Sequence, residues 1–287
     1  MKSDDFLHDS RIGRLIEQAL QEDIGFGDVT SESVIPEDQL GKAIIQAKEN
    51  GVLSGLQLAG LVFQYVDNQT TTEILIPDGE LVSVGEKIAD IHGPVRSILL
   101  GERVALNFLQ RMSGVATLTH KFVHAVSGTS AKITDTRKTV PGLRVLDRKA
   151  VRDGGGVNHR FGLDQMVLIK DNHIAAAGNI SQAVTRCREY LRQHNLQVKV
   201  EVETTTISQV EECLKCGGID RIMLDNFELD RMAEAVRLIN HTAEVEASGG
   251  VTLQTVRAIA ETGVDFISVG ALTHSSRALD ISLELVS

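Results

Sequence analysis

The sequence predicts an α/β protein in which an N-terminal α+β sandwich domain is followed by an irregular (β/α) barrel of six or seven strands. Three observations lead to this fold class. The second half alternates short apolar runs with amphipathic helical stretches, the first half alternates apolar and polar residues between Gly and Pro turns, and polar residues follow the apolar runs. The expected domains are residues 1–114 and 115–274, and the tail 275–287 is a candidate for packing back onto the first.

Six apolar runs in the second half are expected to form parallel strands, at residues 131–134, 166–169, 198–203, 221–224, 243–247 and 266–269. Helix candidates lie between or beside them, at residues 179–194, 206–216, 227–240 and 252–262. Strands and helices that alternate in this way indicate a parallel sheet covered by helices. A barrel is favoured over an open, doubly wound sheet.

The first half has a different pattern. Residues 41–55 and 72–94 alternate apolar and polar side chains, as antiparallel strands with one solvated face do. Residues 56–66 and 97–114 have a helical pattern, and Gly114 is expected to end the second of these helices. These elements together predict the α+β domain.

Composition narrows the function classes. The chain of 287 residues has 29 Lys and Arg against 39 Asp and Glu, a formal charge of −10, and only 3% aromatic residues. An acidic chain with few aromatic rings is a poor candidate for binding nucleic acid or acidic lipid. Three cysteines, no long apolar run and a polar N-terminal sequence predict a cytoplasmic protein. The pair Cys213 and Cys216 is expected to be structural.

One stretch is basic within this acidic chain. Residues 135–173 hold eight Lys and Arg against five Asp. A local excess of positive charge predicts a site for a small polyanion. The outer members, Arg144, Arg148, Lys149 and Arg152, are as easily explained by a solvated, salt-bridged surface.

Polar or small residues stand where each predicted strand ends. They are Asp135, Thr136, Arg137, Lys170, Glu203, Asp225, Ser248, Gly249, Gly250 and Gly270. The carboxyl ends of barrel strands meet at one mouth, where active sites of such barrels are built. The sequence therefore predicts that these residues surround one site.

The two glycine turns are candidates for binding phosphate. Ser248, Gly249 and Gly250 precede a predicted helix, and Gly270 follows the last predicted strand. Bare backbone N–H groups at such a turn attract phosphate, and the last two loops of barrels often bind it together. P-loop and GxGxxG patterns are absent, which argues against a nucleoside triphosphate or a dinucleotide.

Carboxylates and cations complete the predicted site. Glu203 and Asp225 on adjacent strands would suit Mg²⁺ beside a phosphate. Glu201 lies one layer deeper, and a role as buried partner of Lys170 or Arg137 is at least as plausible as a ligand role. The pairs formed by Arg137 with Lys138 and by His159 with Arg160 suit carboxylates and phosphate, whereas His173 is expected to be structural.

Seven strings of this sequence resemble the quinolinate phosphoribosyltransferase family (nicotinate-nucleotide pyrophosphorylase, carboxylating). They are ERVALNFLQRMSGVAT, DTRKTVPGLR, GGGVNHRFGL, IKDNHI, IMLDNF, EASGGV and ISVGALTHS. The resemblance covers nearly the whole chain and is densest from residue 102 to 274. The segment between Glu203 and Asp225 is one residue longer than the family pattern, so the choice between Glu201 and Glu203 stays open.

The resemblance implies an activity and a set of roles. The family condenses quinolinate with phosphoribosyl pyrophosphate, giving nicotinate mononucleotide, pyrophosphate and CO₂ in NAD biosynthesis. Mg²⁺ is implied and no organic cofactor. The residues implied to bind quinolinate are Arg137, His159, Arg160 and Lys170; those implied at the ribose and Mg²⁺-pyrophosphate are Lys138, Glu203 and Asp225; those implied at the 5′-phosphate are Ser248, Gly249, Gly250 and Gly270.

Catalysis is assigned, on the same resemblance, to Lys138, Lys170, Glu203 and Asp225. The family also implies a homodimer, in which Arg103 acts across the interface. An exposed helix arginine is the alternative for Arg103. The implied partners are small molecules, without nucleic acid or membrane.

Two other functions stay open at this point. A related barrel could use another pyridine or carboxylate acceptor, such as nicotinate, without decarboxylation. Alternatively, residues 77–93 resemble the hairpin of a lipoyl or biotinyl carrier, with Lys87 as the modified lysine. Lys87 follows Val-Gly-Glu and lacks the symmetric turn of a carrier, so the carrier is the weaker of the two.

Overall fold

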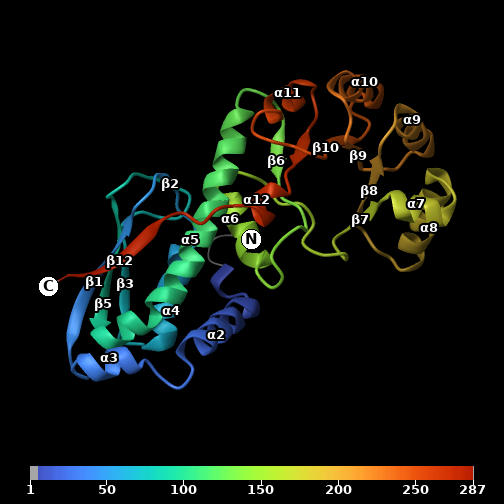
Figure 1. Cartoon of the computed structure of the whole chain (residues 1–287). Helices are drawn as coiled ribbons and strands as arrows, with labels where there is room; N and C mark the ends of the chain where they lie inside the picture. The colour runs from blue at the N-terminus through green and yellow to red at the C-terminus, as the bar shows by residue number, and fades with distance from the viewer. Residues whose placement is uncertain (1–5, 287) are drawn as a thin grey trace. The chain divides into compact units, whose positions relative to one another are not determined.

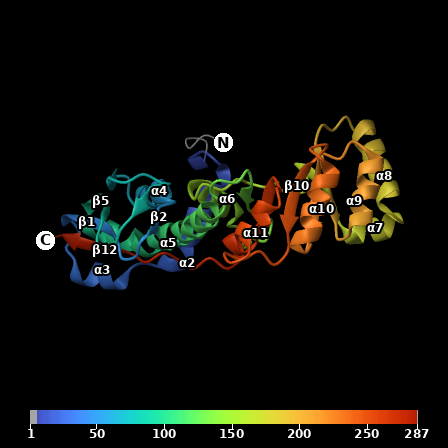
Figure 2. The ribbon, with the colours of Figure 1, turned by 90° about the horizontal axis from the view of Figure 1, so that it is seen from above.

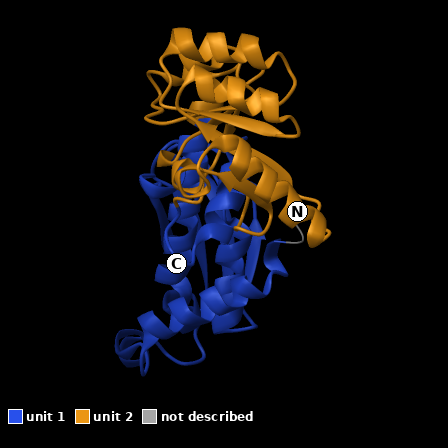
Figure 3. Cartoon of the chain, turned by 90° about the vertical axis from the view of Figure 1, so that its right-hand side faces the viewer, with its two compact units in different colours: residues 1–120, 139–155, 272–287 blue, residues 121–138, 156–271 orange. Residues whose placement is uncertain are grey.

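The computed structural model describes residues 6–286. Residues 1–5 and 287, which belong to the predicted first domain and tail, lie outside the described part. The chain forms two compact units, coloured in Figure 3. The first unit comprises residues 1–120, 139–155 and 272–287, and the second comprises residues 121–138 and 156–271. The expected domain boundary at residue 114 stays a prediction.

The first unit is built on a four-stranded antiparallel sheet in the order β12-β1-β5-β3. Its strands are β1 (Leu40–Ala47), β3 (Thr71–Ile74), β5 (Lys87–Pro94) and β12 (Ile281–Val286), with a separate pair of β2 (Gly51–Val52) and β4 (Leu81–Val82). Its helices are α2 (Ser10–Ile24), α3 (Val29–Val34), α4 (Leu56–Val66), most of α5 (Val95–Ala125), α6 (Arg144–Asp153) and part of α12 (Ala271–His274). Figure 1 shows the C-terminal strand β12 lying beside β1.

Alternation along β1 explains the core of this unit. Ala43, Ile45 and Ala47 are fully buried, whereas the residues between them are partly exposed. Helix α4 packs against β3, where Gly60 lets the helix approach Thr72 closely. The antiparallel strands and the helix at residues 56–66 are as the sequence predicts.

Helix α5 is longer than predicted. The helix expected at residues 97–114 runs from Val95 to Ala125, and Gly114 lies inside it. A Cβ at residue 114 would collide with the backbone of Arg277 and Ala278. Gly114 therefore serves a close chain crossing, and the prediction that it ends the helix is wrong.

The second unit is an irregular barrel wall of six parallel strands in the order β6-β11-β10-β9-β8-β7. The strands are β6 (Lys132–Thr134), β7 (Met166–Ile169), β8 (Lys199–Thr204), β9 (Arg221–Asp225), β10 (Glu244–Ser248) and β11 (Phe266–Ser268). The helices are α7 (Asp171–Ala177), α8 (Ile180–Gln193), α9 (Ile207–Cys216), α10 (Leu229–Ile239) and α11 (Val256–Glu261). All six strands coincide with predicted runs to within one residue at each end.

Each strand of this wall has one apolar side and one polar side. Val200 and Val202 of β8, like Ile222 and Leu224 of β9, are buried on the side of the helices. Consecutive helices α8, α9 and α10 pack side by side along that side (Figure 2). The opposite side carries Glu, Arg, Met and Ser residues, which therefore face the lumen.

The segment after residue 156 fills the open edge of the wall. Strands β6 and β7 are the two edges of the sheet. Val157 forms a parallel bridge with Thr134 of β6, and the Arg160 guanidinium donates to the carbonyl of Met166, at the start of β7, at 2.8 Å. This segment is therefore a seventh, irregular part of the barrel wall.

No helix among residues 6–286 is both long enough and apolar enough to cross a membrane.

Candidate active site

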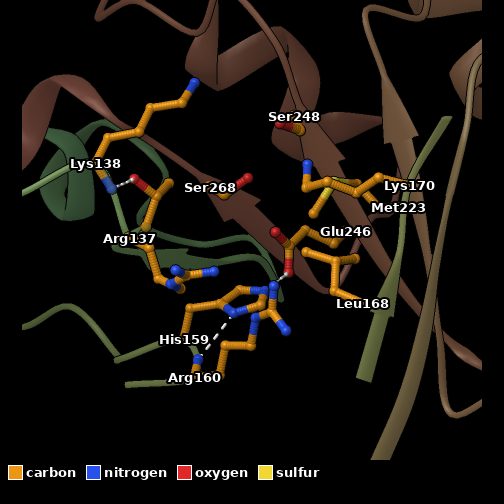
Figure 4. A pocket seen from close by; sticks show the side chains of 11 residues that line it. Arg137, Lys138, His159, Arg160, Leu168, Lys170, Met223, Glu246, Ser248 and Ser268 are labelled. Carbon is orange, nitrogen blue, oxygen red and sulfur yellow. Dashed lines mark hydrogen bonds and ion pairs between the residues drawn. The ribbon is translucent and has the colours of Figure 1, made fainter. Parts of the chain in front are cut away.

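The polar side chains that follow the strands line one open cavity of about 180 Å³ in the second unit (Figure 4). Its lining residues are Thr136, Arg137, Lys138, His159, Arg160, Leu168, Lys170, Met223, Glu246, Ser248 and Ser268. Seven of these were predicted to lie at the site: Thr136, Arg137, Lys138, His159, Arg160, Lys170 and Ser248. The structure thus brings together cations that lie up to 33 residues apart in the sequence.

Buried Asp135 positions the loop that carries two of these residues. Asp135, directly after β6, has no exposed surface. It accepts hydrogen bonds from the Asn158 side chain at 2.6 Å and from the backbone N–H of His159 at 2.7 Å. A buried carboxylate with two donors is a strong anchor, so Asp135 holds His159 and Arg160 at the cavity.

Both ring nitrogens of His159 contact protein atoms. Nε2 lies 3.1 Å from Glu201 and 3.2 Å from Glu246, and Nδ1 accepts the backbone N–H of Arg160 at 2.8 Å. Burial opposes protonation of the ring, whereas the two carboxylates favour it and act to raise the pKa of His159. The N–H of Arg160 opposes a second proton, because a protonated Nδ1 cannot accept it. Because Nδ1 must keep its lone pair for this N–H, we assign the neutral ring with its proton on Nε2, the nitrogen that faces the two carboxylates.

The two carboxylates below His159 have different electrostatic surroundings. Burial raises the pKa of Glu201, which has no exposed surface. Burial acts on Glu246 too, but His159 and Arg221 outweigh it and lower the pKa of Glu246. Arg221 Nη1 donates to Glu246 at 2.7 Å, which stabilises a negative charge on Glu246.

The cations around the cavity repel one another. Burial and the neighbouring Arg137 lower the pKa of the Arg160 guanidinium, and Glu201 offsets only part of this. Arg137, Arg160 and Lys170 all line the cavity (Figure 4). An anion placed among these cations would relieve their repulsion, so the cavity favours a ligand with more than one negative charge.

Glu203 is paired with one of these cations. Its carboxylate forms an ion pair with Lys170, and only 12% of its side chain is exposed. Glu201 lies on the same side of β8, two residues deeper, and contacts His159, so its expected partnership with Lys170 or Arg137 is wrong. Asp225 ends β9 opposite Ser248 of β10, and its carboxylate accepts the side-chain amide of Asn226 at 2.9 Å.

The glycine turn after β10 requires its glycines. Gly249 has φ +96° and Gly250 has φ +57°, which are left-handed values. A side chain at residue 249 would also collide with Asn226. The following helix α11 begins only at Val256, so the expected helix start directly after these glycines is wrong.

Other predicted residues lie away from the cavity lining. Gly270 follows β11, two residues after Ser268, and precedes α12. Arg103 is exposed on α5 in the first unit. His173 accepts the backbone N–H of Lys170 at 2.9 Å through Nδ1 and caps α7, which is the expected structural role.

Several charged and sulfur groups are structural. Lys149 of α6 is buried and forms ion pairs with Asp78 at 2.7 Å and Asp153 at 2.6 Å, so the surface explanation is wrong for this residue. Burial raises the pKa of the Cys213 thiol to about 12, which makes it a poor nucleophile, metal ligand or redox group.

The carrier hypothesis requires Lys87 at the tip of a turn. Lys87 instead begins β5, paired with β1, and its ammonium contacts Asp90 at 2.6 Å. The structure therefore gives no support to Lys87 as a modified lysine.

Sequence reasoning did not find Glu246, Ser268, Leu168 or Met223 as lining residues. Their common signal is the two-residue period of the strands: Glu246 and Ser248 share a side of β10, as Met223 and Asp225 share a side of β9. Reading each strand backwards from its polar end would have indicated Glu246 and Met223.

Two models of protein families match most of the chain. The N-terminal domain of quinolinate phosphoribosyl transferase matches residues 28–113, and the C-terminal domain of the same family matches residues 115–284. The chain belongs to the quinolinate phosphoribosyltransferase family.

Individual members of the quinolinate phosphoribosyltransferase family resemble the chain over most of its length. Quinolinate phosphoribosyltransferase [decarboxylating] 1b of Nicotiana tabacum is 49% identical over 94% of this chain and 81% of its own. The probable nicotinate-nucleotide pyrophosphorylase [carboxylating] of Bacillus subtilis is 42% identical over 96% of this chain and 93% of its own. The solved structure of NadC from Streptococcus pyogenes superposes with a TM-score of 0.92 at 38% identity, covering 96% of this chain and 98% of that one.

Proposed function

We propose that this protein transfers the phosphoribosyl group of phosphoribosyl pyrophosphate to quinolinate, with loss of CO₂. The products are nicotinate mononucleotide, pyrophosphate and CO₂, a step of de novo NAD biosynthesis. Membership of the family supports the reaction. The observation that carries it is the single cavity lined by Arg137, Lys138, Arg160 and Lys170, because a pyridine dicarboxylate needs several cations in one place.

The acceptor would lie among the cations that line the cavity. Arg137 and Arg160 suit bidentate contacts with the two carboxylates, and Lys170 supplies a point charge. Leu168 and Met223, which also line the cavity, offer apolar contact to the pyridine ring. These contacts would orient the pyridine nitrogen for its attack on the ribose. No side chain would have to act as a general acid or base.

The reaction itself is one of positioning and electrostatics. The ring nitrogen forms a bond to the anomeric carbon of the ribose while the bond to pyrophosphate breaks and its electron pair leaves with pyrophosphate. The alkylated ring then accepts the electron pair of the breaking carbon–carboxylate bond, and CO₂ departs. A proton afterwards replaces the carboxylate on the ring carbon. Fixed cations lower both barriers, because they stabilise charge without reorganising.

Phosphoribosyl pyrophosphate is proposed to bind at the strand ends on the side of the cavity away from the quinolinate. Ser248, Gly249, Gly250 and Gly270 are proposed to bind the 5′-phosphate through the glycine turns. Lys138 is proposed to meet the ribose and pyrophosphate. Catalytic roles are proposed for Lys138, Lys170, Glu203 and Asp225.

Magnesium is proposed to arrive with phosphoribosyl pyrophosphate. Glu203 lies opposite Met223 in the sheet register, and Asp225 lies two residues further along the same side of β9. Lys170 already neutralises Glu203, so these residues fit an ion held mostly by substrate oxygens and water, with Asp225 and Glu203 as outer or single contacts. Mg²⁺ would supply charge neutralisation of the leaving pyrophosphate.

Turnover of quinolinate tests the proposal. Purified protein with quinolinate, phosphoribosyl pyrophosphate and Mg²⁺ should release CO₂ and form nicotinate mononucleotide. Arg137→Ala and Arg160→Ala should each lower kcat/KM for quinolinate by about two orders of magnitude or more, because each removes a charged contact made to the reacting acceptor. Normal kcat/KM in either variant would remove that residue from the site, and turnover of nicotinate without CO₂ release would favour the other acceptor.

A homodimer is proposed, in which Arg103 of one subunit completes the cavity of the other. Its exposed position on α5 leaves it available for this contact. Mixing Arg103→Ala with Arg137→Ala subunits should then restore up to about a quarter of the wild-type rate, because half of the dimers are mixed and each has one intact site. Recovery would be absent if Arg103 acted within its own subunit.

A cytoplasmic location is likewise proposed, on the evidence of three free cysteines.

A further inference from the structure

The lumen below the cavity contains a chain of buried charges. Arg221 of β9 is 8% exposed and donates to Glu246 at 2.7 Å and to Glu244 at 3.0 Å, both on the neighbouring strand β10. The Arg221 guanidinium also lies 3.9 Å from the centre of the Phe266 ring. Arg221 is therefore fixed from three sides, and it in turn fixes Glu246.

Glu246, held by Arg221, in turn contacts His159. Its Oε2 lies 3.2 Å from the Nε2 of His159, as the dashed line in Figure 4 shows. The negative charge of this carboxylate favours the tautomer with its proton on Nε2, which leaves a lone pair on Nδ1. That lone pair accepts the backbone N–H of Arg160 at 2.8 Å.

Arg160 is thereby held at both ends. Its backbone N–H is bound by His159, and its guanidinium is bound by the carbonyl of Met166. The rest of the guanidinium faces the cavity (Figure 4). Within the irregular edge between β6 and β7, the regular ladder of a strand does not fix this residue, so these contacts must set its position.

We propose that Glu246 and Arg221 are positioning residues for the carboxylate-binding site: through His159, they fix the main chain of Arg160 and so aim its guanidinium at the acceptor. The proposal rests on the proposed function for the identity of the acceptor. It assigns His159 a role within the protein scaffold, in which both of its nitrogens are used, and leaves the substrate carboxylates to the arginines and lysines.

A buried metal ion is the competing explanation of the same residues. His159, Glu201 and Glu246 place one ligand atom each within 4.8 Å of one another. Arg221, however, donates directly to Glu246, and the charge on Arg160 acts on Glu201. Two guanidinium groups beside a divalent cation would repel it strongly, so the charge balance favours a proton on His159 over a metal ion.

Two matched variants test the proposal. Glu246→Gln removes the charge that holds His159, and Glu244→Gln removes the same charge from the other side of Arg221, without a contact to His159. At saturating phosphoribosyl pyrophosphate, Glu246→Gln should raise KM for quinolinate about tenfold and change kcat less, because the charge that orients His159 is lost. KM for phosphoribosyl pyrophosphate should stay unchanged, and Glu244→Gln, in which the amide oxygen can still accept from Arg221, should change KM for quinolinate much less than Glu246→Gln does. Equal effects of the two variants, or a wild-type KM in Glu246→Gln, would overturn the proposal.

A third variant covers the case in which Glu246→Gln does not fold. Replacing a whole buried ion pair by apolar residues often keeps the fold. The double variant Arg221→Met with Glu246→Met should therefore fold and still show the raised KM for quinolinate. A folded double variant with the wild-type KM would contradict the positioning role.

Nitrogen-15 NMR of labelled histidine tests the proposed tautomer of His159 without an activity assay. The His159 signals, identified by their loss in His159→Gln, should show an Nε2–H ring in wild type and a changed state in Glu246→Gln but not in Glu244→Gln. An Nδ1–H ring or an imidazolium in wild type would overturn the proposal, as would selective broadening of His159 by Mn²⁺ added alone. Absence of quinolinate turnover in wild type would contradict the proposed function, while this spectrum would still decide the tautomer.

Discussion

Asp135 shows how one buried side chain can hold a loop without itself lining the cavity. It has no exposed surface, and it accepts hydrogen bonds from Asn158 and from the backbone N–H of His159. The sequence places Asp135 at a strand end, like the residues that line the cavity, but its carboxylate is turned to the neighbouring loop. Position at a strand end therefore predicts the neighbourhood of a residue better than its role.

The Asp135→Asn variant is expected to lose about 1–3 kcal/mol in the free energy of unfolding, because the new amide group faces donors that it cannot satisfy. Urea unfolding measures the loss, and exposed Asp164→Asn is the control, expected to match wild type. An Asp135→Asn protein as stable as wild type would mean that the loop does not depend on this carboxylate.

At the scale of elements, helix α5 combines a correct and an incorrect expectation. Its helical period was readable from the sequence, but Gly114 resembled an end signal and instead marks a crossing with residues 277 and 278. A glycine can allow the close approach of two chain segments or can end a helix, and the sequence alone does not distinguish these two roles.

Gly114→Ala should therefore be destabilising, although alanine favours helices. The added methyl would collide with the backbone of Arg277, and relief requires the chain to move, at a cost of about 1–3 kcal/mol. Thermal unfolding should show a lower Tm for Gly114→Ala, while Lys121→Ala, at an exposed position of the same helix, should leave the Tm unchanged. A higher Tm in Gly114→Ala would show that the crossing has room.

The strands were more predictable than the contacts inside the barrel. Apolar runs flanked by polar residues gave all six parallel strands, because the helix-facing side must be aliphatic. The contact of Glu201 and Glu246 with His159 joins three segments far apart in the sequence. Strand register and the irregular edge decide that contact, and the sequence carries no local signal for either.

At the scale of the whole molecule, the acidic composition is partly compensated by local partners. Partial burial opposes ionisation of Glu244, but Lys199 and Arg221 outweigh it and lower its pKa. Hydrogen bonds from the side chain and backbone of Ser31 lower the pKa of Asp28 in the first unit. Both groups bind protons more weakly in the folded chain than in the unfolded one.

Stability should therefore fall in acid. A lowered pKa means that the unfolded chain takes up protons first, so the contribution of each group is present above its unfolded pKa, near 4, and is lost as pH falls through its folded value. Urea unfolding at several pH values between 7 and 3 should show the decline, and Glu244→Gln should show a shallower one. An identical decline in wild type and Glu244→Gln would remove Glu244 from this effect.

The segment that closes the gap between β6 and β7 has a consequence for how the enzyme could diversify. Among the residues that the structure describes, Val157 to Arg160 form the one segment of the barrel wall that is attached by an isolated bridge and side-chain contacts instead of a full ladder of hydrogen bonds. Insertions or exchanges there would leave the register of the six regular strands intact. Evolution could thus change which acid the cavity accepts through substitutions in this segment, while the glycine turn after β10 stays as it is.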